Sequence, residues 1–242
     1  MTSARHAQLS HDAAFLQHIE RQQFSEAYAL VGNDLEAYYA TFARLFPASD
    51  PQSMNFGRSS FGNYALIEVE LSQLANAAGY PLSVLDLGCG NGAILDTFQR
   101  AEEWMESYTG LDACQLYIDS GRARHPDATF IHGQYLDDDL PLAETYDAVI
   151  GCAGLSIVPP RQSPGDFLQS ILERYVPRAL NAVIFNGLKA DLSHITQYDL
   201  YTYWNRPLLE VIGSRFGRQE VHRYADHLYQ LAVYPSTSAM FA

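Results

Sequence analysis

The apolar residues of this chain follow two different spacings, and the change between them comes near residue 80. Before it, apolar residues recur three and four positions apart, as in helices with one buried face. Gly32-Asn33, Pro47 and Gly79 are typical signals for the end of a helix. The pattern therefore predicts three helical stretches, at residues 15–31, 35–46 and 63–78, with a Ser-, Gly- and Pro-rich loop before the third.

After residue 82, short apolar runs alternate with helical windows, which is typical of buried parallel strands joined by helices. The predicted strands are residues 83–88, 108–112, 129–133, 146–151 and 181–187. Residues 167–175 have the period of a helix, and we expect another helix to begin at Asn91 and to bury Ile94, Leu95 and Phe98. Residues 221–224 and 228–234 are too close together for a crossover, so they should pair antiparallel.

These elements predict an α/β fold: a doubly wound, mostly parallel seven-stranded sheet with an antiparallel C-terminal edge strand and an N-terminal helical cap. We assign residues 1–80 to the cap, which also serves as a lid. Residues 81–242 form the ligand-binding domain, and the two parts are expected to make one integrated domain.

Composition narrows the choice of partners. The 242-residue chain is 48% hydrophobic, which is ample for a core, and carries a net charge of −13. Lys189 is its only lysine and the arginines are scattered, so a nucleic-acid partner is not expected. Three widely spaced cysteines and dispersed histidines predict neither a disulfide framework nor a metal site. Without a signal peptide or an apolar run long enough for a membrane span, we expect a cytoplasmic protein, with a homodimer as one option.

The most informative stretch is "VLDLGCGNGAIL" at residues 84–95, where three glycines follow a predicted strand. Glycines at this turn accept positive φ and let a ligand approach the backbone. Gly88-x-Gly90-x-x-Ala93, with Asp112 downstream, formally satisfies the dinucleotide pattern. The alternative is a G-x-G-x-G loop preceded by Asp86, which is used for S-adenosylmethionine.

Residues 80–235 resemble the class I S-adenosylmethionine-dependent methyltransferases, through "VLDLGCGNG", "TGLD" and "YDAVIGCAGLSIVPP". The resemblance implies that Asp112 takes both ribose hydroxyls and that Asp86 orders the loop or contacts the cofactor ammonium through water. Where the family often has an acidic residue near the adenine, this chain has Gln134 and Tyr135, which could accept from the amine and stack on the ring. The full set expected to contact S-adenosylmethionine is Asp86, Gly88, Cys89, Gly90, Gly92, Asp112, Ala113, Gln134, Tyr135 and Cys152.

The acceptor side is less defined, because Ser156-Ile157 stand where the family frequently has paired histidines. Methyl transfer from a sulfonium needs mainly alignment, so the family has no universal catalytic residue. Our candidates for acceptor binding are Arg58, Tyr64, Tyr201 and Trp204, whose aromatic members would favour a flat or cationic molecule. Our candidates for catalysis are His194 as general base, Tyr198 and Asn186.

The resemblance, together with the glycine loop and Asp112, implies an enzyme that would methylate an N or O nucleophile of a small molecule. Two alternatives stay open at this point. One is an NAD(P)-dependent oxidoreductase, and the other is a non-catalytic binding protein with the methyltransferase fold.

Overall fold

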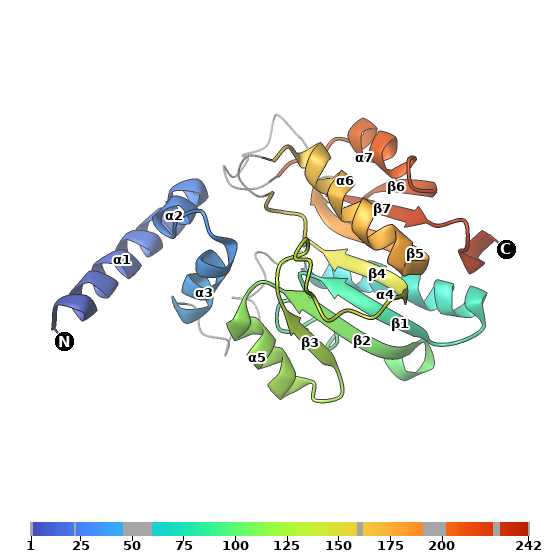
Figure 1. Ribbon diagram of the computed structural model, residues 1–242, viewed down its shortest axis with the longest axis horizontal. Helices are drawn as coiled ribbons and strands as arrows, with labels where there is room; N and C mark the ends of the chain where they lie inside the picture. Colours follow the sequence, from blue (N-terminus) through green and yellow to red (C-terminus); the bar gives the residue numbers. More distant parts are fainter. Residues whose placement is uncertain are drawn as a thin grey trace.

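Seven strands form one sheet in the order β3-β2-β1-β4-β5-β7-β6 (Figure 1). The computed structural model describes residues 2–21, 23–45, 60–158, 162–190, 202–224 and 228–241. Strands β1 to β5 are parallel, whereas β7 runs antiparallel to both of its neighbours, β5 and β6. The sheet confirms the predicted fold. The last strand of the chain, β7, lies inside the sheet between β5 and β6, and β6 forms the antiparallel edge. The strands are β1 (Leu82–Leu87), β2 (Met105–Asp112), β3 (Thr129–His132), β4 (Tyr146–Cys152), β5 (Ala179–Lys189), β6 (Arg218–Tyr224) and β7 (Leu228–Tyr234).

Helices cover both faces of this sheet, because neighbouring strand residues point to opposite sides. On one face, Leu85 and Leu87 pack with α6 (Pro164–Tyr175) and α7 (Arg206–Gly213). On the other, Val84 packs with α4 (Ser60–Ala78) and α5 (Gln115–Arg124). Two short helical turns, η1 (Ala101–Glu103) and η2 (Val176–Arg178), lead into β2 and β5, and a third, η3 (Ala239–Phe241), follows β7.

The first three helices make a separate layer beside the sheet, α1 (Thr2–Glu20), α2 (Phe24–Leu30) and α3 (Leu35–Leu45) (Figure 1). Their own core is aromatic: the rings of Phe15 and Tyr28 each lie 5.5 Å from that of Tyr38. The His132 imidazole at the end of β3 lies 3.2 Å from the Glu36 carboxylate of α3. Packing of α3 on α5 and this side-chain contact place α3 beside the carboxyl ends of the strands.

Three expectations differ from the structure. The first helical stretch is two helices, separated at residues 21–23. Helix α4 packs on β4 and β5, so it belongs to the sandwich, and only α1–α3 form the cap. No helix begins at Asn91: Gly90 and Gly92 have φ of 56° and 73°, which a right-handed helix cannot include, and turns continue from there to η1. Ile94 and Phe98 are nevertheless buried, as the pattern predicted.

Within the described ranges, the helices that are long enough to cross a membrane are not apolar enough to do so.

Candidate functional site

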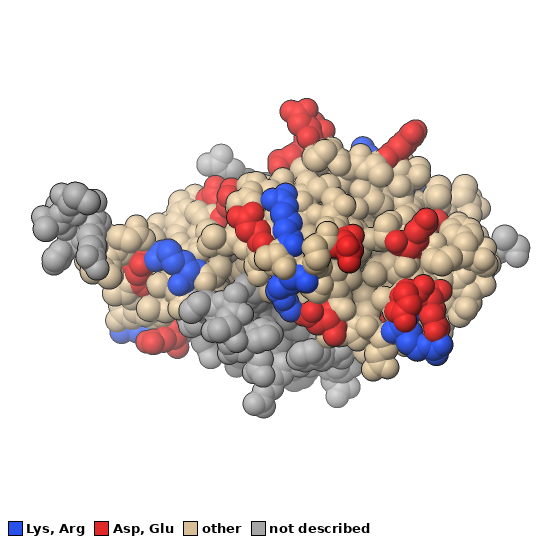
Figure 2. Space-filling model, turned by 90° about the horizontal axis from the view of Figure 1, so that it is seen from below, with Lys and Arg blue, Asp and Glu red and all other residues tan. Residues whose placement is uncertain are grey.

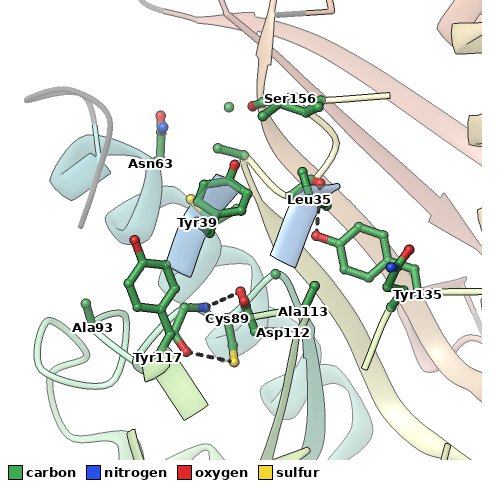
Figure 3. A pocket seen from close by; sticks show the side chains of 18 of the residues that line it. Leu35, Tyr39, Asn63, Cys89, Ala93, Asp112, Ala113, Tyr117, Tyr135 and Ser156 are labelled. Carbon is green, nitrogen blue, oxygen red and sulfur yellow. Dashed lines mark hydrogen bonds between the residues drawn. The ribbon is translucent and has the colours of Figure 1, made fainter. Parts of the chain in front are cut away.

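A cavity of about 210 Å³ opens at the carboxyl ends of β1, β2, β4 and β5, and α3 closes one side of it (Figure 3). This is where a doubly wound sheet binds ligands, because each strand ends there in a loop with unpaired backbone groups. The loops that follow β1, β2, β3 and β4 all contribute lining residues. The glycine loop therefore opens onto a cavity large enough for part of a small ligand.

The three glycines of this loop have different surroundings, although all have positive φ. A side chain at Gly88 would collide with the Tyr135 hydroxyl. A Cβ at Gly92 would come within 2.7 Å of the Phe130 ring, so this glycine serves the packing of the loop on β3. Gly90 has nothing within 4 Å of the place where its Cβ would be. Gly88 and Gly90 line the cavity and Gly92 does not, so only the space at Gly90 is left for a ligand.

Asp112 holds the glycine loop to the end of β2. Its Oδ2 accepts the backbone N–H of Gly90 at 2.9 Å, and its Oδ1 accepts that of Cys114 at 2.8 Å. Burial raises the pKa of this carboxyl, and the two N–H donors act against that rise. One carboxylate thus fixes two loops at once and still lines the cavity.

Asp86 lies underneath the loop and does not line the cavity. Its Oδ2 accepts the Tyr108 hydroxyl at 2.7 Å, while its buried Oδ1 has no hydrogen-bond partner among the described residues. Burial raises the pKa of Asp86 to about 7, although the Tyr108 hydroxyl lowers it and Asp112 adds to the rise. The carboxyl is therefore poised between its two protonation states near neutral pH.

The loop after β4 forms the opposite wall. Ala153 has a φ of 59°, a conformation that costs a residue with a Cβ about 1–2 kcal/mol. Its N–H donates to the Asn186 carbonyl at 2.9 Å, which holds the strained turn to β5. Tyr135, from the loop after β3, donates its hydroxyl to the Gly154 carbonyl at 3.0 Å. Backbone strain of this kind concentrates at ligand sites.

A hydrogen-bonded network joins α4, β5 and β6 beside this wall. The Tyr224 hydroxyl accepts the Gly187 N–H at 2.6 Å and donates to Asn63 Oδ1 at 2.9 Å. The Asn186 amide donates to the Asn63 carbonyl at 2.6 Å. Asn63 lines the cavity, whereas Asn186 lies behind it, fully buried.

Helix α3 supplies two lining residues that the sequence did not single out, Leu35 and Tyr39 (Figure 3). The Tyr39 ring lies 6.2 Å from that of Tyr117 on α5, which also lines the cavity. Burial raises the pKa of Tyr39 well above its usual value, so the phenol stays protonated. The helical period indicated one apolar face for α3, but it could not show which part of that face meets the glycine loop.

The structure brings most of the predicted cofactor contacts to this cavity: Gly88, Cys89, Gly90, Asp112, Ala113, Gln134, Tyr135 and Cys152 line it. Asp86 and Gly92 support the loop from behind. Among the acceptor candidates, Tyr64 lines the cavity. Trp204 lies in the core against α6 and α7 with none of its surface exposed, which removes its large ring from water, although its Nε1 has no hydrogen-bond partner among the described residues. Arg58, His194, Tyr198 and Tyr201 lie outside the described residues.

The described residues also contain no group of three or more His, Cys, Asp or Glu side chains arranged to hold a metal ion.

Comparisons with known proteins agree with this geometry. A family model for a methyltransferase domain matches residues 84–177. The magnesium protoporphyrin IX methyltransferase of Synechocystis PCC 6803, crystallised with S-adenosylmethionine, is 16% identical with a TM-score of 0.57, over 84% of this chain and 95% of that one. The plantazolicin methyltransferase BpumL, crystallised with S-adenosylhomocysteine, is 17% identical with a TM-score of 0.57, over 83% and 96%. At such identities the likeness establishes the fold.

A curated relative matches over a shorter stretch. The mRNA cap guanine-N(7) methyltransferase of Pyricularia oryzae is 38% identical over 53 residues, which cover 22% of this chain and only 11% of that protein. The family model covers the segment that contains the glycine loop, and the fold of the solved neighbours includes that segment. Residues 84–177 of this chain therefore resemble a methyltransferase domain, and the fold around them is shared with methyltransferases crystallised with S-adenosylmethionine or S-adenosylhomocysteine.

Proposed function

We propose that this protein transfers the methyl group of S-adenosylmethionine to an N or O nucleophile of a small molecule. The observation that carries the proposal is the arrangement of Gly90 and Asp112, in which an open backbone position and a fixed carboxylate face the same cavity. The fold-level neighbours that act on small molecules support the kind of acceptor.

The donor groups of the cavity fit this cofactor. Its methionine part is a zwitterion without phosphates, so it needs backbone N–H and C=O groups rather than a cluster of cations. The open space at Gly90 lets such a ligand approach the backbone, although the Gly90 N–H itself is held by Asp112. Asp112 can accept two ribose hydroxyls in charge-assisted hydrogen bonds, since each carboxylate oxygen accepts more than one donor. Gln134 and Tyr135 also line the cavity, which supports the expectation that they meet the adenine.

When bound, the cofactor supplies a methyl group already activated on a sulfonium. The chain then has to hold the nucleophile in line with that methyl group and to exclude water. Tyr64 and Asn63 on α4, and Ser156 after β4, line the cavity and can contact an acceptor. The candidates His194 and Tyr198 for proton removal, Arg58 and Tyr201 for acceptor binding, and Asn186 for orienting the nucleophile stay predictions.

Calorimetric titration with S-adenosylhomocysteine tests the cofactor, and a parallel titration with NADH tests the oxidoreductase alternative. We expect micromolar binding of the first and none of the second. Absence of S-adenosylhomocysteine binding at millimolar concentration would refute the proposal. Release of S-adenosylhomocysteine from S-adenosylmethionine in the presence of an acceptor panel separates an enzyme from a non-catalytic binding protein.

An RNA acceptor is the second candidate, because one stretch of 53 residues resembles a cap methyltransferase. The net charge of −13 opposes it, since nucleic-acid binding depends on neutralising phosphates. On the face shown in Figure 2, the basic side chains lie in small groups among acidic ones, without a broad basic surface. Salt-sensitive binding of capped RNA would favour this candidate over a small molecule.

A further inference from the structure

Asn63 is the polar member of a buried stripe on α4. Ile67, Leu71 and Leu74 follow it at helical spacing, have none of their surface exposed and pack against the sheet. Asn63 is only 4% exposed, but it lies toward the carboxyl ends of the strands and lines the cavity. A buried amide needs partners for its polar atoms, so the hydrogen bonds of Asn63 determine how its side chain is oriented.

Three hydrogen bonds fix that orientation. The backbone N–H of Gly187 can only donate, and the Tyr224 hydroxyl accepts it at 2.6 Å. Burial raises the pKa of Tyr224, so its hydroxyl keeps its proton and donates in a hydrogen bond to Asn63 Oδ1 at 2.9 Å. The Asn186 side-chain amide donates to the Asn63 backbone carbonyl at 2.6 Å. A reversed Asn63 amide would turn an N–H group toward Tyr224 and take away the acceptor of its hydroxyl proton.

The amide nitrogen of Asn63 is left facing the cavity. Its Nδ2 lies 3.2 Å from the place where a Cβ of Gly187 would be, and Gly187 itself lines the cavity. The hydrogen bonds that Asn63 makes with described residues outside its own helix use Oδ1 and the backbone carbonyl, and none uses Nδ2. A side-chain amide N–H donates and cannot accept. Asn63 therefore presents a donor of fixed polarity to a molecule beside Gly187.

This donor lies in the part of the cavity away from Asp112. Gly187 follows Asn186, where the parallel ladder between β4 and β5 ends, whereas Asp112 ends β2. Strands β2 and β5 are three positions apart in the sheet, about 14 Å at about 4.8 Å per position. Figure 3 likewise shows Asn63 well apart from Asp112. If Asp112 holds the ribose of the cofactor, as the proposed function has it, Asn63 faces the methyl acceptor.

We propose that Asn63 is a specificity-determining residue: the methyl acceptor carries a carbonyl oxygen that accepts a hydrogen bond from Asn63 Nδ2. Tyr224 is then a positioning residue, which acts by orienting the amide. This inference rests on the proposed function and names a feature of its substrate class. A molecule without the carbonyl leaves the donor unpaired in a buried site, which lowers its affinity. A molecule with an N–H group or an ammonium at that point places two donors face to face.

The test compares ketones with hydrocarbons of nearly the same shape on the protein saturated with S-adenosylhomocysteine. The probe pairs are 3-acetylindole with 3-ethylindole and 1-indanone with indane, whose members are neutral and differ in a carbonyl oxygen. Selective ¹⁵N labelling of asparagine gives an NMR signal for the proposed donor, which Asn63→Leu identifies by removing it. We expect at least one ketone to move the Asn63 Nδ2 proton signal downfield, as a new hydrogen bond does, and its hydrocarbon to leave that signal in place.

Calorimetry with the unlabelled protein gives the second measurement. The parent protein should bind that ketone about tenfold more tightly than its hydrocarbon. Asn63→Leu should abolish this preference, and Tyr224→Phe, which keeps the amide but no longer orients it, should reduce it. Asn76→Leu makes the same change at an exposed site of the same helix and should keep the preference. A loss of structure would lower both affinities, whereas their ratio reports the donor.

Several results would overturn the inference: failure of both ketones to bind, equal binding of ketone and hydrocarbon, an unmoved Asn63 signal, or an unchanged ratio in Asn63→Leu. A tenfold fall in S-adenosylhomocysteine affinity in Asn63→Leu would also overturn it, because the donor would then belong to the cofactor. S-adenosylhomocysteine binding to the parent protein is measured first, so its failure would refute the proposed function separately.

Discussion

Asp112 offers the sharpest test of the site, through the substitution Asp112→Asn. The carboxylate accepts the N–H groups of Gly90 and Cys114 with its two oxygens. An amide of the same shape has one oxygen, so it can accept one of these donors and turns its NH₂ group toward the other. The variant therefore loses at least one charge-assisted hydrogen bond and places two donors face to face.

A hydrogen bond to a charged group contributes about 1.5–3 kcal/mol. If the loop reforms its geometry only when the cofactor binds, this cost appears in the affinity, which falls about 10- to 100-fold at about 1.4 kcal/mol per factor of ten. Ribose hydroxyls that share the carboxylate would add to the loss. Titration calorimetry with S-adenosylhomocysteine measures the change, and urea unfolding shows how much of the cost falls on the free protein.

Asp119→Asn is the matched control, because Asp119 is an exposed acid on α5 that bonds to Gln115 and Arg122. It removes the same charge close to the site without touching the glycine loop. We expect its affinity to stay within twofold of the parent protein. If Asp112→Asn also binds within twofold and unfolds at the same urea concentration, the reasoning about this carboxylate is refuted.

Three further predictions concern the surroundings of the loop. The folded state raises the pKa of Asp86 to about 7 from an unfolded value of 3.8, so the folded protein holds a proton that the unfolded chain releases. This contribution to stability is present below about pH 4 and is lost between pH 4 and 7. Urea unfolding from pH 5 to 8 should therefore show a smaller decline for Asp86→Asn than for the parent, and parallel curves would contradict this. Gly92→Ala and Gly90→Ala both put an alanine at positive φ, which costs about 1–2 kcal/mol, but Gly92→Ala should destabilise the protein further, by about 1–3 kcal/mol, through its clash with Phe130, whereas Gly90→Ala should in addition weaken S-adenosylhomocysteine binding; equal effects of the two variants on both properties would count against the division between the two glycines. Trp204→Ala should cost about 3–5 kcal/mol of unfolding free energy with an unchanged cofactor affinity, and the reverse pattern would return Trp204 to the acceptor site.

The sequence predicted the sheet well because its strands are short apolar runs bounded by turns, and this local signal is strong when both faces of a sheet are buried. The hairpin of β6 and β7 followed from chain length alone, since three residues cannot form a crossover. The prediction of a helix at Asn91 was wrong for a local reason as well. The apolar residues there have helical spacing, but the positive φ angles of Gly90 and Gly92 prevent a helix.

The site residues that belong to one local sequence motif could be predicted. The site residues that come from elements distant in the sequence could not. Gly88, Gly90 and Asp112 sit in recognisable turns. Tyr39 reaches the cavity only because the cap folds back over the strand ends, and nothing in its neighbourhood marks that contact. Trp204 shows the opposite limit: an aromatic residue in a polar stretch resembled a binding residue, yet its side chain is buried in the core.

The position of β7 has a consequence for the way the sheet is completed during synthesis. The outer edge of β5 pairs with residues 228–234, near the end of this sequence. The N–H and C=O groups of that edge therefore have no strand partner until residues 228–234 have left the ribosome. Residues 183–185 of that edge are fully buried and apolar in the finished fold. An open apolar edge is a template for pairing with other chains. Nascent chains that stop short of residue 228 should therefore associate with one another, even though the whole glycine loop is already made.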